Sequence, residues 1–277
     1  SLAELVAINN GTTGNITLNS NAVALTGSTS DVKAALAGNV GASYTGNIVL
    51  NDADNTSIAA ADITTIESDT TGTITVSNNI RLTGNSDVIA AAVADVNTFS
   101  GTPTATLSDA HTLAELKAIN NKLSGTLTLN DVNVALTGSA ADIKAALAGT
   151  FAAGYTGNVT INDADTTGIA ATDITAIEAA TTGTVTVSNN INLTGTSAEI
   201  AAAVADVNTF SGTPTATLSD AHTLAELKAI NNKLSGTLTL NDVTVALSGS
   251  SADVAAALAG SFTSGYTGNA TTTDAHT

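Results

Sequence analysis

The 277-residue chain contains no cysteine, methionine or tryptophan, and aromatic residues make up only 3% of it. Without cysteine the chain forms neither disulfides nor thiolate metal sites. A compact core of this size usually needs bulky aromatic side chains to fill irregular gaps, so their shortage argues against one large globular domain. A stack of repeated segments needs few of them, because each segment offers the same narrow space to small aliphatic side chains.

Basic residues are also scarce, with 7 Lys and Arg against 24 Asp and Glu and a net charge of −17. We therefore expect no binding to nucleic acid or to anionic membrane surfaces, because both require a positive face. Cations, calcium among them, would be attracted. No apolar run approaches the length of a membrane helix, so we expect no membrane insertion. The regular pattern of the hydrophobic residues, 43% of the chain, excludes a disordered acidic tail.

The sequence repeats itself at an offset of 111 residues. The phrase Leu2-Ala-Glu-Leu5 recurs from Leu113 and again from Leu224, and residues 89–132 are identical to residues 200–243. Self-similarity at a fixed period is the signature of repeat architectures. The repeat units are 1–111, 112–222 and a partial unit, 223–277.

Each unit divides further at regularly placed glycines, which open segments that resemble strands. The spacings between these glycines run 32, 26, 29 and 24 residues and then repeat, which gives four coils per full unit and about ten in the chain. The glycines are Gly14, Gly46, Gly72, Gly101, Gly125, Gly157, Gly183, Gly212, Gly236 and Gly268.

Within a coil the same elements follow one another. Residues 126–129, 159–161 and 184–187 alternate Thr with Val, Leu or Ile, which predicts half-buried strands. A polar corner of Asn, Asp or Ser comes next, and the long coils add a second short strand, for example over 132–136 and 190–193. Helix starts are then indicated by capping-box spacing at Thr112 with Glu115, Ser139 with Asp142, Thr196 with Glu199, and Ser250 with Asp253.

Strand, corner, helix and return, repeated about ten times, predict parallel strands joined by helical crossovers. We therefore predict an α/β fold in which residues 1–277 form a single right-handed solenoid of strand–turn–helix coils. One continuous parallel β-sheet would run along it, in a layout like that of a leucine-rich-repeat array. Because parallel strands lie about 4.8 Å apart and packed helices about 8–10 Å apart, we expect gentle curvature with the sheet concave.

Three phrases of the sequence resemble the tandem repeats of giant secreted or cell-surface proteins of marine cyanobacteria. They are Thr223-Leu-Ala-Glu-Leu-Lys-Ala-Ile-Asn-Asn232, Leu136-Thr-Gly-Ser-Ala-Ala-Asp142 and Gly154-Tyr-Thr-Gly-Asn-Val-Thr-Ile161. The resemblance covers essentially the whole chain. It implies an extracellular or cell-surface location and a role in surface layers, adhesion or filaments, and it brings no catalytic residues.

The acidic corners are candidate calcium sites. Calcium takes six to eight oxygen ligands, and stacked corners of neighbouring coils would offer Asp carboxylates and carbonyl groups together. The glycine-rich nonapeptide of calcium-binding β-rolls is missing, and the alternative is that Asp and Asn only form turns and cap backbone groups. The candidate ligands are Asp52, Asp54, Asp109, Asp131, Asp163, Asp165, Asp220 and Asp242.

Tyr44, Tyr155 and Tyr266 occupy one repeat position, on the loop that returns to the next strand. They either pack that loop against its neighbour or form a regularly spaced contact for a glycan or another chain. Together with the acidic corners they support an alternative function, that of a calcium- or glycan-binding adhesin module.

Threonine pairs suggest a more remote alternative. A flat Thr ladder would indicate ice binding, and the pairs are Thr126/Thr128, Thr184/Thr186 and Thr237/Thr239. Coils that contain Pro103 and Pro214 interrupt such a ladder, and Thr is in any case favourable on an exposed strand.

Nothing in the sequence indicates catalysis, so we expect no enzyme and no cofactor other than calcium. His111, His222 and His276 lie too far apart along the coils to share one metal ion, and no nucleophile elbow is present. An active site needs an arrangement of side chains that occurs at one place in the chain, whereas the repeat units of this sequence are nearly identical.

The ends of the chain suggest self-association or covalent continuation. Ser1 begins inside a repeat unit without a basic-then-apolar signal segment, so we expect the chain to be a piece of something longer. Asp274-Ala-His-Thr277 is the phrase that elsewhere precedes a helix start. Head-to-tail contacts of this kind build rods or filaments. The sequence therefore predicts a structural repeat segment of an extracellular rod, filament or surface layer.

Overall fold

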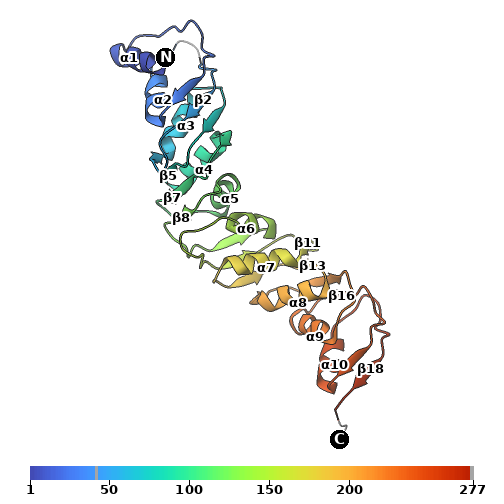
Figure 1. Cartoon of the computed structure of the whole chain (residues 1–277). Coiled ribbons are helices and arrows are strands. Elements are labelled where there is room, and N and C mark those ends of the chain that lie inside the picture. The colour runs from blue at the N-terminus through green and yellow to red at the C-terminus, as the bar shows by residue number, and fades with distance from the viewer. Residues whose placement is uncertain (41–42, 275–277) are drawn as a thin grey trace. The chain divides into compact units, whose positions relative to one another are not determined.

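The structure, a computed structural model, describes residues 1–40 and 43–274, so His276 lies outside the described residues. The chain divides into two compact units. The first comprises Ser1–Val132 with Ala145–Ala153, and the second comprises Asn133–Lys144 with Gly154–Thr277. Both units are α/β, with helices that alternate with short parallel strands (Figure 1). None of the described helices combines the length and apolar character that crossing a lipid bilayer requires.

Ten helices lie within the described residues, and four of them begin at the predicted capping residues Thr112, Ser139, Thr196 and Ser250. The Thr112 hydroxyl accepts a hydrogen bond from the Glu115 N–H, and the Glu115 carboxylate accepts one from the Thr112 N–H. Side-chain caps are also formed by Thr196, Ser139 and Ser250. The helices are α1 Leu2–Gly11, α2 Thr29–Leu36, α3 Ala60–Ser68, α4 Ser86–Asp95, α5 Leu113–Lys122, α6 Ala140–Leu147, α7 Ala171–Ala180, α8 Ser197–Asp206, α9 Leu224–Lys233 and α10 Ser251–Leu258.

The strands are short because a polar corner breaks most extended segments in two. In the first unit they are β1 Leu25–Gly27, β2 Ile48–Leu50, β3 Ser57–Ala59, β4 Ile74–Val76, β5 Arg81–Gly84, β6 Thr98–Phe99, β7 Thr104–Leu107 and β8 Leu127–Thr128. In the second unit they are β9 Leu136–Gly138, β10 Val159–Ile161, β11 Gly168–Ala170, β12 Val185–Val187, β13 Asn192–Gly195, β14 Thr209–Phe210, β15 Thr215–Leu218, β16 Leu238–Thr239, β17 Leu247–Gly249 and β18 Ala270–Thr272.

All described strand pairings are parallel, and each joins one segment to the next. The first unit holds sheets β1-β2-β4-β6 and β3-β5-β7-β8, and the second holds β9-β10-β12-β14, β11-β13-β15-β16 and the pair β17-β18. The described strands thus form five sheets rather than the one continuous sheet predicted from the sequence. The sheet is divided because a polar corner interrupts the coil. For example, β10 and β11 lie on either side of the polar corner 162–165 and join different sheets, so one coil contributes a strand to each of two sheets.

The core of each unit is a column of aliphatic side chains from successive strands. In the first unit Ile48 lies opposite Ile74 and Leu50 lies opposite Val76, and all four side chains have an exposed fraction of 0%. Thr75, between the two buried residues of β4, is partly exposed. The predicted alternation of apolar and polar positions is therefore confirmed here. Burial of each such side chain contributes about 1.5–3 kcal/mol.

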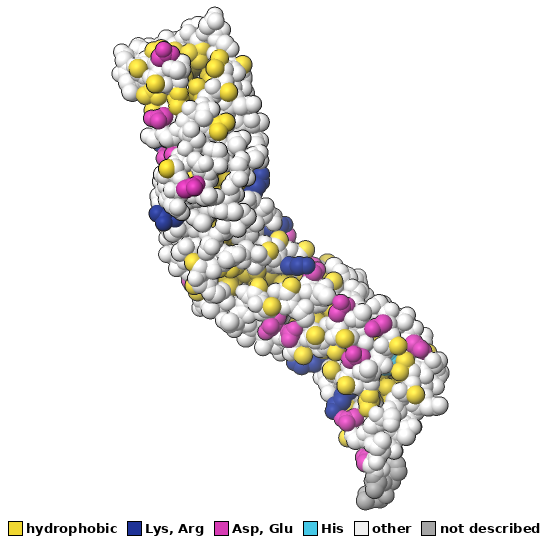
Figure 2. All heavy atoms as spheres, in the orientation of Figure 1, with side chains coloured by type: hydrophobic (Ala, Val, Ile, Leu, Met, Phe, Trp, Pro, Cys, Tyr) yellow, Lys and Arg dark blue, Asp and Glu magenta, His cyan; other side chains and the backbone are white. Residues whose placement is uncertain are grey.

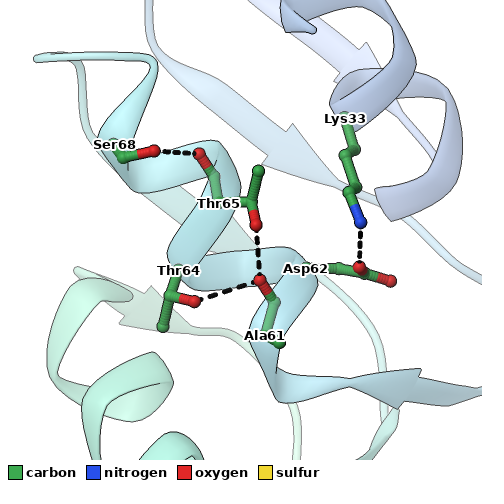
Figure 3. Close-up of polar contacts among 6 residues, drawn as sticks. All are labelled: Lys33, Ala61, Asp62, Thr64, Thr65 and Ser68. Carbon is green, nitrogen blue, oxygen red and sulfur yellow. Dashed lines mark hydrogen bonds and ion pairs between the residues drawn. The ribbon is translucent and has the colours of Figure 1, made fainter.

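Ion pairs join neighbouring helices within each unit. Lys33, the fifth residue of α2, pairs with Asp62, the third residue of α3 (Figure 3). In the same view the Thr64 and Thr65 hydroxyls donate to the Ala61 carbonyl inside α3. The pairing of a fifth residue with a third residue recurs as Lys144 with Asp173 and Lys228 with Asp253. These groups are partly exposed, so each pair contributes about 1 kcal/mol or less.

Candidate functional site

Four of the eight candidate aspartates at the polar corners, and Asp274 with them, cap a helix of the preceding segment. Asp220 Oδ1 accepts a hydrogen bond from the N–H of Ser197, the first residue of α8, at 2.7 Å. Asp109 accepts one from the N–H of Ser86, the first residue of α4, at 2.7 Å. A carboxylate is stabilising at a helix start because the N–H groups there lack partners within the helix. The same bond joins Asp52 to Thr29, Asp163 to Ala140 and Asp274 to Ser251.

Three of the other corner aspartates accept hydrogen bonds from groups in loops. Asp54 and Asp165 accept hydrogen bonds from backbone N–H groups one segment further along the chain, at 2.8 and 2.9 Å. Asp242 accepts one from the hydroxyl and one from the N–H of Thr244, and these bonds lower the pKa of Asp242. Asp131 is exposed. Asp274, which was not among the candidate residues, also belongs to the helix-capping set, and the phrase that it shares with Asp109 and Asp220 is the signal for it.

These contacts favour the structural interpretation of the corners over calcium binding. Among the described residues, no three His, Cys, Asp or Glu side chains form a group that would hold a metal ion. We expect the melting temperature to be the same in millimolar calcium and in EDTA, because most of the corner carboxylates already accept backbone hydrogen bonds. A ligand of the folded state would raise it. A calcium-dependent rise that EDTA reverses would contradict this expectation and support the adhesin alternative.

Replacing Asp220 by alanine tests the role of the corner aspartates. We expect Asp220→Ala to lower the free energy of unfolding by about 1 kcal/mol, the usual contribution of a side-chain helix cap. Asp220→Asn keeps an oxygen acceptor for the Ser197 N–H and is expected to lose less. Urea unfolding followed by circular dichroism measures both variants. Equal losses in the two, or no loss in either, would contradict the capping role.

The repeated tyrosines pack against the preceding segment. Tyr44 and Tyr155 have exposed fractions of 3% and 1%, and each is paired in a parallel β-bridge with a threonine of the next segment. Each tyrosine hydroxyl donates to a backbone carbonyl, those of Val23, Val134 and Val245 respectively. These contacts favour loop packing over ligand binding. Tyr266 is only partly buried, so contact with a glycan or another chain stays a prediction for this position.

His222 is a buried polar residue within the second unit. Its exposed fraction is 3%, its Nε2 lies 3.0 Å from the Tyr266 hydroxyl, and the two rings are tilted with centroids 5.6 Å apart. Because the Tyr266 hydroxyl donates to Val245, Nε2 carries the proton and donates to that hydroxyl. Burial lowers the pKa of His222, although Asp242 and other nearby carboxylates oppose the shift. The imidazole is therefore neutral and serves packing.

The buried histidines predict a loss of stability in mild acid. Burial also lowers the pKa of His111 below its ordinary value of 6.5, so for both residues the unfolded state binds the proton more readily. The contribution of the two neutral histidines to the free energy of unfolding is complete above pH 6.5, and it is lost as the pH falls toward their pKa in the folded state. We expect the melting temperature to fall between about pH 7.5 and about pH 5.5, and to fall less in the double variant His111→Asn/His222→Asn. Identical pH profiles would contradict this.

The threonine pairs do not form one ladder. Thr128 lies on β8, Thr186 on β12 and Thr239 on β16, and these strands belong to three different sheets. A different row does occur on neighbouring strands of one sheet, formed by Thr137, Thr160, Thr186 and Thr209. The threonine pairs on which the ice-binding alternative depends therefore lie on separate sheets and do not form one flat row.

An open hollow beside α1 is a feature that the sequence analysis missed. Its volume is about 430 Å³, and Leu5, Ile8 and Val23 are among its lining residues. Ile8 and Val23 are the large hydrophobic residues that stand out as exposed in the described part of the chain, with exposed fractions of 48% and 58%. The sequence repeat gives no sign of this feature, because Ile119 and Ile230, which occupy the position of Ile8 in the other two copies of the helix, are buried. The hollow is one candidate for an interaction site.

Comparison with protein-family models, with curated proteins and with solved structures finds no match to this chain. The functional conclusion therefore depends on the contacts described above.

Proposed function

We propose that the chain is a structural repeat segment: a right-handed α/β solenoid that acts as a stiff spacer in an extracellular rod, filament or surface layer. The observation that carries the proposal is that successive segments within each unit are joined by the same three kinds of contact. These are parallel strand pairs, a buried aliphatic column and side-chain hydrogen bonds from one segment to the next. Stability in such an array is a sum of segment terms and neighbour interfaces.

The use of the polar side chains supports a mechanical role. Most of the corner aspartates, the three tyrosine hydroxyls and the paired lysines contact backbone or side-chain groups of an adjacent segment. A binding or catalytic surface would instead need polar groups that converge on an unfilled space. The extracellular location is part of the proposal and is supported by the resemblance of the repeat phrases to those of cyanobacterial surface proteins.

Small-angle X-ray scattering of the dilute chain tests the solenoid. A compact domain of this length has a radius of gyration of about 19 Å. Ten helices packed about 8–10 Å apart in one row would extend over about 80–100 Å, with a radius of gyration of about 25–30 Å. We expect the larger value and a distance distribution with a long tail. A radius near that of the compact domain would contradict the spacer function.

A further inference from the structure

A small hollow lies where helices α2 and α3 end, within the first unit. Its volume is about 190 Å³, and its polar lining residues are Ser43, Ser68 and Asp69. Val40 and Tyr44 also line it. Neighbouring helices pack on both sides of this pair, since α1 contacts α2 and α4 contacts α3. The space, which we call the α2–α3 hollow, is therefore bounded by segments that each have a neighbour.

The polar lining of the α2–α3 hollow departs from the repeat. At all three polar positions the next repeat unit carries a small residue without a polar side chain. The residues there, 111 positions later, are Gly154, Ala179 and Ala180. Tyr44, which packs its loop, does recur as Tyr155. Residues that the segment needs for folding recur with the period, so the three polar groups that do not recur indicate a local role in the first unit.

Asp69 carries a carboxylate that the fold does not stabilise. It caps the C-terminal end of α3 and is partly buried. Burial raises the pKa of Asp69, and within the described part of the chain no hydrogen bond or positive charge offsets that effect. The last turn of α3 contains no basic residue. Carbonyl groups at this end of a helix carry partial negative charge, so an acidic side chain is unfavourable here without a cation.

The charge around the hollow favours a cation as its ligand. The chain has a net charge of −17, and Figure 2 shows acidic side chains spread over the surface with fewer basic ones among them. Glu67, in the last turn of α3, is exposed two residues before Asp69. A surface of one sign raises the local concentration of ions of the opposite sign. An anionic ligand is therefore excluded.

The three polar lining groups match a primary ammonium group. Such a group has three N–H donors, and the Asp69 carboxylate with the hydroxyl oxygens of Ser43 and Ser68 offers three acceptors. The Ser68 hydroxyl donates its proton to the Thr65 carbonyl at 2.7 Å, so its oxygen is available to accept (Figure 3). Val40 offers apolar surface to the methylene groups that carry an ammonium. A calcium ion would instead need six to eight oxygen ligands.

We propose that the α2–α3 hollow binds a primary ammonium group, which comes from a lysine side chain of a partner protein or from a small free amine. Asp69 supplies the charge, and Ser43 and Ser68 supply the further acceptors. The binding site goes beyond the spacer function and does not depend on it. Scattering measures the shape of the chain, whereas the experiment below measures binding, so either proposal can fail alone.

An NMR titration of the isotope-labelled 277-residue chain tests the site. The probes are n-butylammonium chloride and, in a separate arm, Nα-acetyl-lysine amide, both at constant ionic strength. We expect saturable changes in the backbone amide signals of Ser68, Asp69 and Thr70, with millimolar affinity. Nα-acetyl-norleucine amide, which lacks the ammonium group, is expected to cause none. Tighter binding of the lysine derivative would support a polypeptide as the source, and tighter binding of n-butylammonium would support a free amine.

Variants of Asp69 separate binding from folding. Asp69→Asn is expected to weaken the binding of both probes by about tenfold or more. Asp69→Ala copies the residue of the next repeat unit and is expected to abolish binding. Neither is expected to lower the melting temperature, because the carboxylate lacks a stabilising partner in the fold. Asp206→Asn makes the same change in net charge at the end of α8 and is expected to leave the affinity unchanged.

Several results would overturn the proposal. The absence of saturable changes in the unmodified chain is the first, and an equal response to the norleucine derivative is the second. Unchanged affinity in both Asp69 variants, or an equal loss in Asp206→Asn, would show that general charge attraction explains the signal. A lower melting temperature in both Asp69 variants would assign the carboxylate a structural role. Saturable changes of the same signals with calcium chloride would indicate a metal site instead.

Discussion

Replacement of Ile119 by alanine is expected to lower the free energy of unfolding by about 2–5 kcal/mol, the range for deletion of a fully buried branched side chain. Ile119 lies on α5 with an exposed fraction of 0%, and α4 packs against this helix. The substitution removes apolar contacts and leaves a cavity that the short alanine side chain does not fill. Denaturant unfolding with a fitted midpoint and slope measures the effect.

The matched control lies in the same repeat phrase. Ile8 occupies on α1 the position of Ile119, 111 residues earlier, but its exposed fraction is 48%. At a concentration where the chain is monomeric, Ile8→Ala is expected to cost about 1 kcal/mol or less, because water already reaches this side chain. Comparison of Ile119→Ala with Ile8→Ala therefore measures the effect of burial at one position of the repeat. Equal losses in the two variants would show that the covering helix contributes nothing.

Replacement of Gly183 by alanine is expected to destabilise the second unit by about 1–3 kcal/mol or more. An added Cβ would lie 2.3 Å from the carbonyl oxygen of Gly157 and 2.8 Å from the backbone nitrogen of Asn158. These are backbone atoms of the neighbouring segment, so no side-chain rotation relieves the clash. The segments would have to separate locally, which weakens the adjoining pairing of β10 with β12.

Gly154 provides the control for this substitution. A Cβ added at Gly154 has no heavy atom within 4 Å, so the space is open. Gly154→Ala is expected to be neutral or slightly stabilising, because alanine restricts the unfolded chain more than glycine does. Thermal melts of both variants followed by circular dichroism give the comparison. A loss in Gly154→Ala as large as that in Gly183→Ala would contradict the close approach as its cause.

Local structure in this protein follows directly from the sequence. The capping pair Thr112 and Glu115 starts a helix as its spacing predicts, and the alternating residues 159–161 form β10. Side-chain spacing within a few residues determines such elements, because the hydrogen bonds of a cap and the alternation of a strand are local. The 111-residue period likewise comes from the sequence alone.

Only the tertiary structure decided what each repeated side chain contacts. Asp220 and Ser197 are 23 residues apart, and no local pattern predicts that one caps the helix of the other. The division of the strands into five sheets also depends on which strands meet across segments. Similar phrases have different exposure for the same reason: Ile8 and Ile119 occupy the same position of closely similar helices, but the exposure of each depends on what packs against it.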